Sequence, residues 1–239
     1  MLCIEPDKPS IADLIAKSHT LEQAGEVSRA LYVAKQAVAL ARSSGGGEPL
    51  AAALVCVAYC QHHLGHFDQA SALAGDALRI AQPDSQTSVE ALRILGNCAH
   101  EAGDLSGAEG YYHQAIDIAR SQGYHALLQS CLHSLSACVY LPRGQFELAL
   151  AADEEALRLA LELGLEKRLW FSLDMIGWIY WMTGQRGRAL ELEILHALPL
   201  TSNGEILFEN LLLALAETHR DAKGLALPKS AAPFDVYLM

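Results

Sequence analysis

Apolar residues recur through most of the chain at positions i, i+3, i+4 and i+7, the spacing that places them on one face of a helix. Short turn-forming stretches such as "SSGGGEP" and "AQPDSQTS" separate the periodic segments. The composition agrees with helices, because alanine and leucine dominate and only 7% of the residues are aromatic. We therefore expect helices over 11–24, 27–43, 49–64, 67–82, 85–102, 105–122, 124–141, 146–163, 166–183 and 186–198, and a further one over 205–220.

A phrase headed by glycine occurs five times along the chain, at intervals of 40, 38, 41 and 40 residues. An alanine stands five residues after each glycine, and a large residue followed by a small one precedes most of them by eight and seven residues. In the fourth copy the pair Leu135 and Ser136 fits only if the "LPRG" segment carries one extra residue, and in the first copy, Lys17 and Ser18, only the small member is kept. The glycines are Gly25, Gly65, Gly103, Gly144 and Gly184.

Each repeat is expected to be a pair of helices joined at its glycine, which ends the first helix at a position that needs a positive φ. The small residues seven before and five after the glycine let the two helices approach closely. One such hairpin cannot bury its apolar face alone, so the repeats must stack into a solenoid.

The segment "ALRILGNCAHEAGDLSGAEGYYHQAI", residues 91–116, resembles the tetratricopeptide repeat (TPR), which pairs Leu-Gly with a downstream aromatic residue, a turn glycine and two spaced alanines. The period, near forty rather than thirty-four, resembles that of bacterial signalling proteins such as MalT-type activators and TPR-bearing diguanylate cyclases. The resemblance implies an all-α fold, a right-handed α-α superhelix of about five helical hairpins plus a C-terminal capping helix. The expected parts are a lead-in (1–10), five TPR-like repeats (11–198), the capping helix (199–220) and a tail (221–239).

In such a solenoid the first helix of each repeat lines a concave groove, and the side chains on that face are candidates for binding. Trp178 and Trp181 are turned away from Ile176 and Tyr180, which lie on the packed stripe. The alternative for the two tryptophans is packing against the last helix of the array. Offsets from the turn glycines extend this face to residue types that anchor interfaces well. The candidate groove residues are Tyr59, His62, His63, Arg93, Asn97, His100, His133, Tyr140, Asp174, Trp178 and Trp181.

Arg93 and Asn97 lie one turn apart and could hold a carboxylate or a backbone amide of a peptide. They resemble part of the carboxylate clamp of chaperone-binding TPR domains. The lysines that complete that clamp are absent at the matching positions, which hold Ile15 and His19. We therefore treat the two residues as ordinary groove residues.

The charge and the termini exclude several classes of partner. The formal net charge is −11 and there is no basic stripe, so no nucleic-acid partner is expected. The N-terminal "MLCIEPDKPS" lacks the pattern expected of a signal peptide, and the longest apolar stretch is too short to be expected to span a bilayer. We expect a cytoplasmic protein with no membrane partner.

Candidate chemistry is sparse. Cys60, Cys98 and Cys138 share one repeat position, which indicates packing, and no second ligand pair supports a metal site at Cys56 and Cys60. No phosphate-binding loop, dinucleotide fingerprint, HExxH or nucleophile elbow occurs. The carboxylates from Asp153 to Glu155 are expected on an exposed helix face. No metal, cofactor, catalytic residue or enzymatic activity is expected.

We predict a non-enzymatic protein–protein interaction module that binds a peptide or protein segment in its groove, as a regulatory adaptor. One alternative is the sensory or regulatory region of a larger signalling protein whose effector domain is absent from this chain. A second is a dimerising structural scaffold, with a homodimer formed through the largely apolar helix 205–220.

Overall fold

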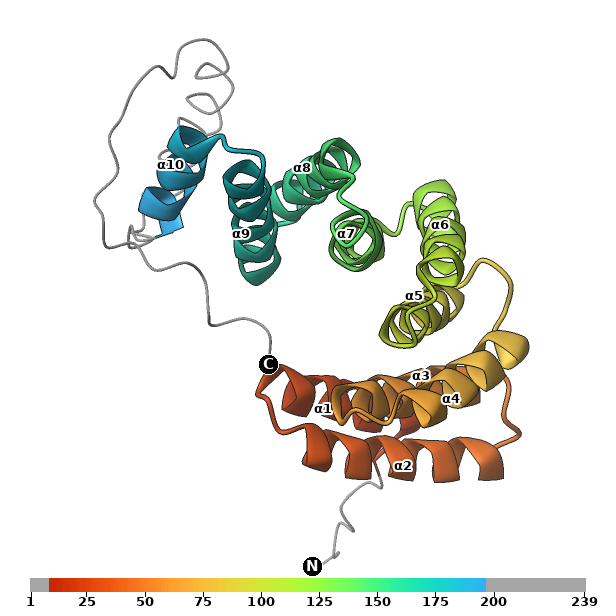
Figure 1. Cartoon of the computed structure of the whole chain (residues 1–239). Coiled ribbons are helices and arrows are strands. Elements are labelled where there is room, and N and C mark those ends of the chain that lie inside the picture. Colours follow the sequence, from red (N-terminus) through yellow and green to blue (C-terminus); the bar gives the residue numbers. More distant parts are fainter. Residues whose placement is uncertain (1–8, 197–239) are drawn as a thin grey trace, which may run out of the picture. The chain divides into compact units, whose positions relative to one another are not determined.

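The structure is a computed structural model that describes residues 9–196, apart from the side chains of residues 191 and 193–196. Within this range it contains helices and turns only, and the helix ends fall within a residue or two of those predicted (Figure 1). The predicted helix 205–220, the tail and residues 1–8 of the lead-in lie outside the described residues. The helices are α1 (Ile11–Gln23), α2 (Val27–Ser43), α3 (Glu48–His63), α4 (Phe67–Ile80), α5 (Gln86–Glu101), α6 (Leu105–Gln122), α7 (His125–Leu135), η1 (Ser136–Tyr140), α8 (Phe146–Glu162), α9 (Glu166–Met182) and α10 (Arg186–His196).

The five repeat glycines form the turns that join the two helices of each hairpin. Their φ angles lie between 67° and 79°, a region that residues with a side chain rarely adopt. No atom lies within 4 Å of the place where a Cβ would stand on any of them, so glycine is selected by the backbone conformation and not by lack of space. The prediction that each hairpin turns at its glycine is confirmed.

Side chains cap three of the helix starts. Ser10, Ser85 and Asp104 precede α1, α5 and α6, and each accepts a hydrogen bond from the backbone N–H three residues further on. At α1 the cap is reciprocal, because the Asp13 carboxylate accepts from the Ser10 backbone N–H. These caps explain why the helices begin where the polar residues of the turns end.

The alanines of the repeat lie where paired helices approach most closely. Ala30, Ala70, Ala108 and Ala149, five residues after their glycines, have no exposed surface. The third hairpin carries a tighter version of this packing, because a Cβ added to Gly96 would stand 2.7 Å from the ring of Tyr112. Small residues are therefore a steric requirement of the hairpins.

Two serines confirm the register of the repeats that depart from the pattern. Ser18 Oγ donates to the Ala30 carbonyl at 3.1 Å, and Ser136 Oγ donates to the Ala149 carbonyl at 3.2 Å. Each bond joins the small residue before the turn to the alanine five residues after the glycine. The first copy therefore keeps its small residue, and the fourth copy is shifted by one residue as predicted.

The extra residue of the fourth repeat lies in a π-helical turn. Residues Ser136–Tyr140, directly after α7, are π-helical, so one residue more than usual is wound into this turn. The sequence indicated an extra residue but placed it in the "LPRG" segment, and predicted one regular helix over 124–141. Both points are wrong, because the insertion is absorbed earlier, inside the first helix of the hairpin.

The chain divides into two compact units between Ser172 and Leu173, and each is described by itself. In the first unit α1 contacts α3, α3 contacts α5 and α5 contacts α7, whereas contacts between α2 and α4 or between α4 and α6 are slight or absent in the described part. The odd-numbered helices therefore form the inner side of this stack. In the second unit a Cβ added to Gly177 of α9 would stand 3.7 Å from the side chain of Leu192 of α10.

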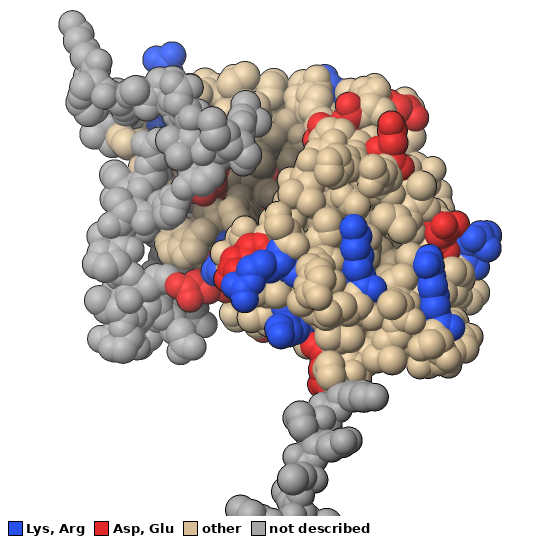
Figure 2. Space-filling model, turned by 90° about the horizontal axis from the view of Figure 1, so that it is seen from below, with Lys and Arg blue, Asp and Glu red and all other residues tan. Residues whose placement is uncertain are grey.

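The charges on one face of the molecule and the apolar character of the helices bear on contacts with nucleic acid and with membranes. On the face shown in Figure 2, Lys and Arg side chains are isolated or lie next to acidic ones, among many uncharged residues. That face offers no broad basic area for a nucleic-acid backbone. None of the described helices has the length and apolar character needed to cross a membrane.

Candidate functional site

The odd-numbered helices bring charged and aromatic side chains together on the inner side of the first unit. We call this surface the inner face, and it is formed by α1, α3, α5, α7 and the start of α9. Its central residues influence one another's pKa values although they come from four different helices. They are Glu22, Tyr59, Glu90, Arg93 and Arg168.

Tyr59 stands at the middle of this cluster. The guanidinium of Arg93 lies 5.7 Å from its ring centre, and the ring of His63 lies 4.3 Å away. Burial and then the charge of Glu22 raise the pKa of the Tyr59 hydroxyl to about 12, so it stays a hydrogen-bond donor at neutral pH. Tyr59, His63 and Arg93, three of the predicted groove residues, therefore lie together, and their part in binding stays a prediction.

The two arginines give this region a positive character. Burial, and then the positive charge of Arg93, lower the pKa of Arg168, so the two positive charges act on each other. Burial raises the pKa of Glu90, although the charges of Arg93 and His19 oppose it. Burial disfavours the charged form of Glu90. Glu90 therefore offsets the positive charge of the two arginines less than an exposed carboxylate would.

Three buried polar atoms near the inner face have no hydrogen-bond partner among the described residues. They are Arg93 Nε, His62 Nε2 and His100 Nδ1, and all three belong to residues predicted for the groove. An unpartnered buried polar atom costs about 1–3 kcal/mol. A bound ligand could supply the missing partners. His62 and His100 also occupy the same repeat position, three residues before the turn glycine, and the His62 ring packs against Phe67 at 5.3 Å.

Asn97 has a different role from the predicted one. The Tyr112 hydroxyl donates to its Oδ1 at 2.7 Å, so the amide oxygen is used inside the hairpin. The pair Arg93 and Asn97 therefore does not present two free groups to a ligand. Arg93 and Asn97 do lie one turn apart, but the hydroxyl of Tyr112, fifteen residues after Asn97, bonds to the Asn97 amide oxygen.

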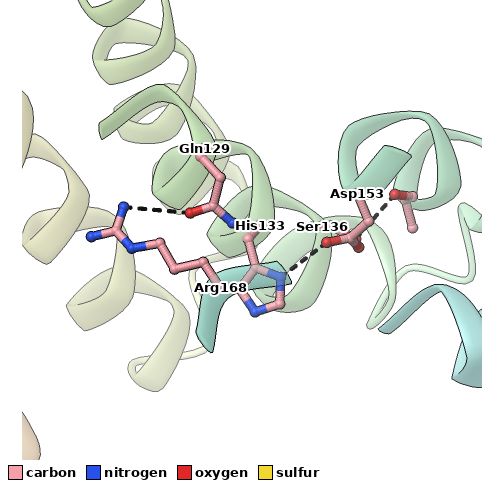
Figure 3. A network of polar contacts seen from close by, with 6 residues as sticks. Gln129, His133, Ser136, Asp153 and Arg168 are labelled. Carbon is pink, nitrogen blue, oxygen red and sulfur yellow. Dashed lines mark hydrogen bonds and ion pairs between the residues drawn. The ribbon is translucent and has the colours of Figure 1, made fainter. Parts of the chain in front are cut away.

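His133 belongs to a buried network in the fourth repeat (Figure 3). Its Nδ1 lies 2.9 Å from Asp153 Oδ1, and Ser136 Oγ donates to Asp153 Oδ2 at 2.5 Å. Asp153 has no exposed surface, so its predicted place on an exposed helix face is wrong. Burial raises the pKa of Asp153, while the bonds from His133 and Ser136 oppose the shift.

The serine, histidine and aspartate of this network are not arranged for nucleophilic catalysis. Both Ser136 and His133 bind the carboxylate, whereas a catalytic serine would donate to the imidazole. The same serine also bonds to the Ala149 carbonyl, inside the hairpin. The contacts describe a structural network that fixes α8 against the π-helical turn.

The remaining predicted residues lie elsewhere. Tyr140 is buried, and after burial itself the charges that act on its pKa are those of Glu109 and Arg143, not those of the inner face. Asp174, Trp178 and Trp181 belong to the second unit, where each is half-buried and the Arg186 guanidinium lies 5.5 Å from the Trp181 ring. Groove binding by these four residues stays a prediction.

Four residues of the inner face were missed by sequence reasoning. Glu22 occupies the same repeat position as His62 and His100, and Glu90 lies one turn before Arg93, so both could have been found by spacing. Arg168 donates to the Ala126 carbonyl at 2.5 Å and lies 3.5 Å from Gln129 Oε1. Phe171, one turn later, is 55% exposed and its ring centre lies 6.4 Å from that of His133.

Comparisons with known proteins identify the fold. No protein-family model and no curated protein matches the chain. A Rap protein complexed with competence and sporulation factor superposes with a TM-score of 0.71, at 15% identity over 87% of this chain and 58% of that one. BtubC from P. vanneervenii gives 0.60 at 16% identity, over 92% of this chain and 87% of that one. The thermophilic TPR protein TTC0263 from Thermus thermophilus gives 0.57 at 18% identity, over 85% and 100%.

At these identities the likeness shows the fold alone. The predicted all-α, TPR-like solenoid is confirmed, and the similar structures include a TPR protein. The resemblance to MalT-type activators and to diguanylate cyclases stays a prediction.

Proposed function

We propose that this chain is a protein–protein interaction module that binds a peptide or protein segment along the inner face of its first unit and acts as a regulatory adaptor. The observation that carries the proposal is the state of Arg93. Its Nε is buried without a partner, and no hydrogen bond or ion pair of its guanidinium is found among the described residues. An arginine whose Nε is buried without a partner and whose guanidinium bonds to no carboxylate is a ready site for one.

The neighbours of Arg93 indicate what kind of segment fits. Arg168 adds a second positive charge, and Phe171 offers an exposed ring one turn further along α9. Tyr59 supplies an aromatic surface beside Arg93. Arginine and aromatic residues are the types most enriched at binding interfaces. A segment with a carboxylate next to an apolar side chain is therefore the ligand that this surface favours.

The comparison with the Rap protein supports the proposal at the level of the fold. That protein is complexed with competence and sporulation factor, so a helical stack of this kind can hold a second molecule. The ligand of this chain is proposed from its own residues, because the identity is only 15%.

A peptide-display selection with matched variants tests the proposal. Peptides selected on the wild-type chain are measured by fluorescence anisotropy on the double variant Arg93→Gln/Phe171→Ser. The matched control is Tyr32→Ser/Arg42→Gln on α2, which removes an exposed aromatic residue and an exposed arginine from the outer side. We expect the inner-face variant to lose at least about tenfold in affinity, about 1.4 kcal/mol, and the control to lose little.

Equal affinities in all three proteins would place binding elsewhere and overturn the proposal. Circular dichroism and thermal unfolding of both variants verify that the helices are retained. If the wild-type chain selects no peptide at all, the inner face is not a peptide-binding surface.

A further inference from the structure

The described residues include five cysteines, and one of them has an imidazole beside it. Cys56 Sγ lies 3.6 Å from His19 Nε2, within hydrogen-bonding range of sulfur. On the other side of the ring, His19 Nδ1 lies 3.6 Å from Glu22 Oε2. The carboxylate of Glu22 and the imidazole of His19, both on α1, and the thiol of Cys56 on α3 thus form a line of contacts. The order is that of an activated nucleophile, with a base next to the sulfur and a third group that orients the base.

We propose that Cys56 is a modification site, a thiol that is activated by His19 and reacts with small electrophiles and with hydrogen peroxide. The inference is independent of the proposed peptide binding. It goes beyond the expectations from the sequence, which offers no support for a metal site at Cys56 and Cys60 and predicts no chemistry there. No group of three or more potential metal ligands is found in the described part of the chain.

The contacts define the reaction. His19 Nε2 accepts the proton of the Cys56 thiol, and Glu22 stabilises the imidazolium that results. With hydrogen peroxide the sulfur electron pair forms an S–O bond while the O–O bond breaks. The leaving hydroxide takes the proton held by His19 and departs as water, so the sulfur is oxidised to a sulfenic acid and the peroxide is reduced.

The charges around His19 favour this direction of proton transfer. Its hydrogen bonds to Cys56 and to Glu22 raise the pKa of His19, and the charge of Glu90 on α5 adds to them, although burial opposes the shift. A protonated imidazole next to sulfur stabilises the thiolate, which is the reactive form. Glu22 also acts on three other groups of α3. Tyr59 and Cys60 stay neutral at neutral pH because burial raises the pKa of Tyr59 to about 12 and that of Cys60 to about 11. Burial lowers the pKa of His63, and the charge of Glu22 opposes that shift.

The other buried cysteines provide internal controls. Burial raises the pKa of Cys60, Cys98 and Cys131 to about 11, so they remain thiols at neutral pH. Cys56 is as buried as they are, with 3% of its surface exposed. Its neighbour His19 has 41% of its side chain exposed, so we expect a reagent to reach the sulfur past the imidazole. That approach restricts the site to small reagents.

Site-resolved alkylation tests the proposal. The chain with Cys3→Ser, which removes the cysteine outside the described residues, is treated with iodoacetamide over a range of pH around neutrality. Mass spectrometry then gives the rate at each cysteine. We expect Cys56 to react at least about tenfold faster than Cys60 and Cys131 at neutral pH, and His19→Gln to remove that advantage. His113→Gln, a matched change at an exposed histidine of α6, leaves that advantage intact.

The role of Glu22 is to position His19, and its test is the pH profile. In Glu22→Gln the rise in the Cys56 rate should move to higher pH, because the imidazolium loses its stabilising carboxylate. Hydrogen peroxide followed by a sulfenic-acid trap should label Cys56 before the other three buried cysteines. A Cys56 rate no higher than that of Cys60, or one that His19→Gln does not change, would overturn the proposal. The first of these outcomes is read in the chain with native His19, so it does not depend on the folding of a His19 variant.

Discussion

A single repeat site can hold different residues when the residue opposite compensates. Nine residues after the turn glycine stand Ala34, Ala74, Tyr112 and Asp153, all without exposed surface. Tyr112 lies opposite Gly96, and Asp153 lies opposite Ser136, which donates a hydrogen bond to it. At the repeat positions that Gly96 and Tyr112 hold, the second hairpin has Ala58 and Ala74. In the third hairpin the large Tyr112 is accommodated by the small Gly96, and in the fourth the polar Asp153 is accommodated by the polar Ser136.

The Asp153 network leads to a prediction about pH. In Asp153→Asn the amide oxygen can accept from His133, and the amide can donate to Ser136 while Ser136 donates to Ala149. Because the pKa of Asp153 is raised in the folded state, the wild-type chain loses stability as pH rises through that pKa, whereas the variant does not. We expect the variant to be at least as stable at neutral pH, with an advantage that shrinks towards about pH 4, the ordinary range of aspartate.

Urea unfolding at neutral and acidic pH measures this difference. Asp153→Leu is the contrasting variant, because it leaves His133 Nδ1 without its acceptor and should cost about 1–3 kcal/mol. A loss of stability in Asp153→Asn as large as in Asp153→Leu would show that the network needs the charge.

At the scale of the helical element, the third hairpin gives the sharpest steric prediction. Gly96→Ala places a Cβ 2.7 Å from the Tyr112 ring, and both residues are buried. We expect a cost of about 1–3 kcal/mol from overpacking. In the background Tyr112→Ala the same change should cost much less, because it recreates the Ala58 and Ala74 pair of the second hairpin. A double-mutant cycle by chemical denaturation measures the coupling, and additive costs would contradict this account.

The sequence predicted the helices, the turn glycines and the small residues well, because each depends on the chain near it. It failed where a partner far along the chain decides the outcome. Asn97 is occupied by Tyr112, and Asp153 is buried because His133 and Ser136 accompany it. The interval of 41 residues revealed the extra residue, but only the backbone shows that a π-helical turn absorbs it. Arg168 was missed because its contacts depend on how the repeats stack.

At the scale of the whole molecule, the array implies an uneven stability. In the first unit α5 packs against α3, α4, α6 and α7, whereas α1 packs against α2 and α3 alone among the described helices. In a stacked array each repeat is stabilised by its neighbours. We therefore predict by hydrogen exchange that the amides of α5 exchange more slowly than those of α1. Equal protection in the two helices would mean that the unit opens only as a whole.

The π-helical turn at Ser136–Tyr140 bears on how such an array can be recombined. An insertion that the helix had not absorbed would have rotated every following side chain by about 100°, since each residue turns a helix by that angle. Here the residues after the π-helical turn keep the repeat's register, so the insertion leaves the packing of the neighbouring hairpins unchanged. A chimaera that includes the fourth hairpin must therefore keep the π-helical turn together with Asp153. The second hairpin has no such turn, so it can be exchanged as a regular repeat unit.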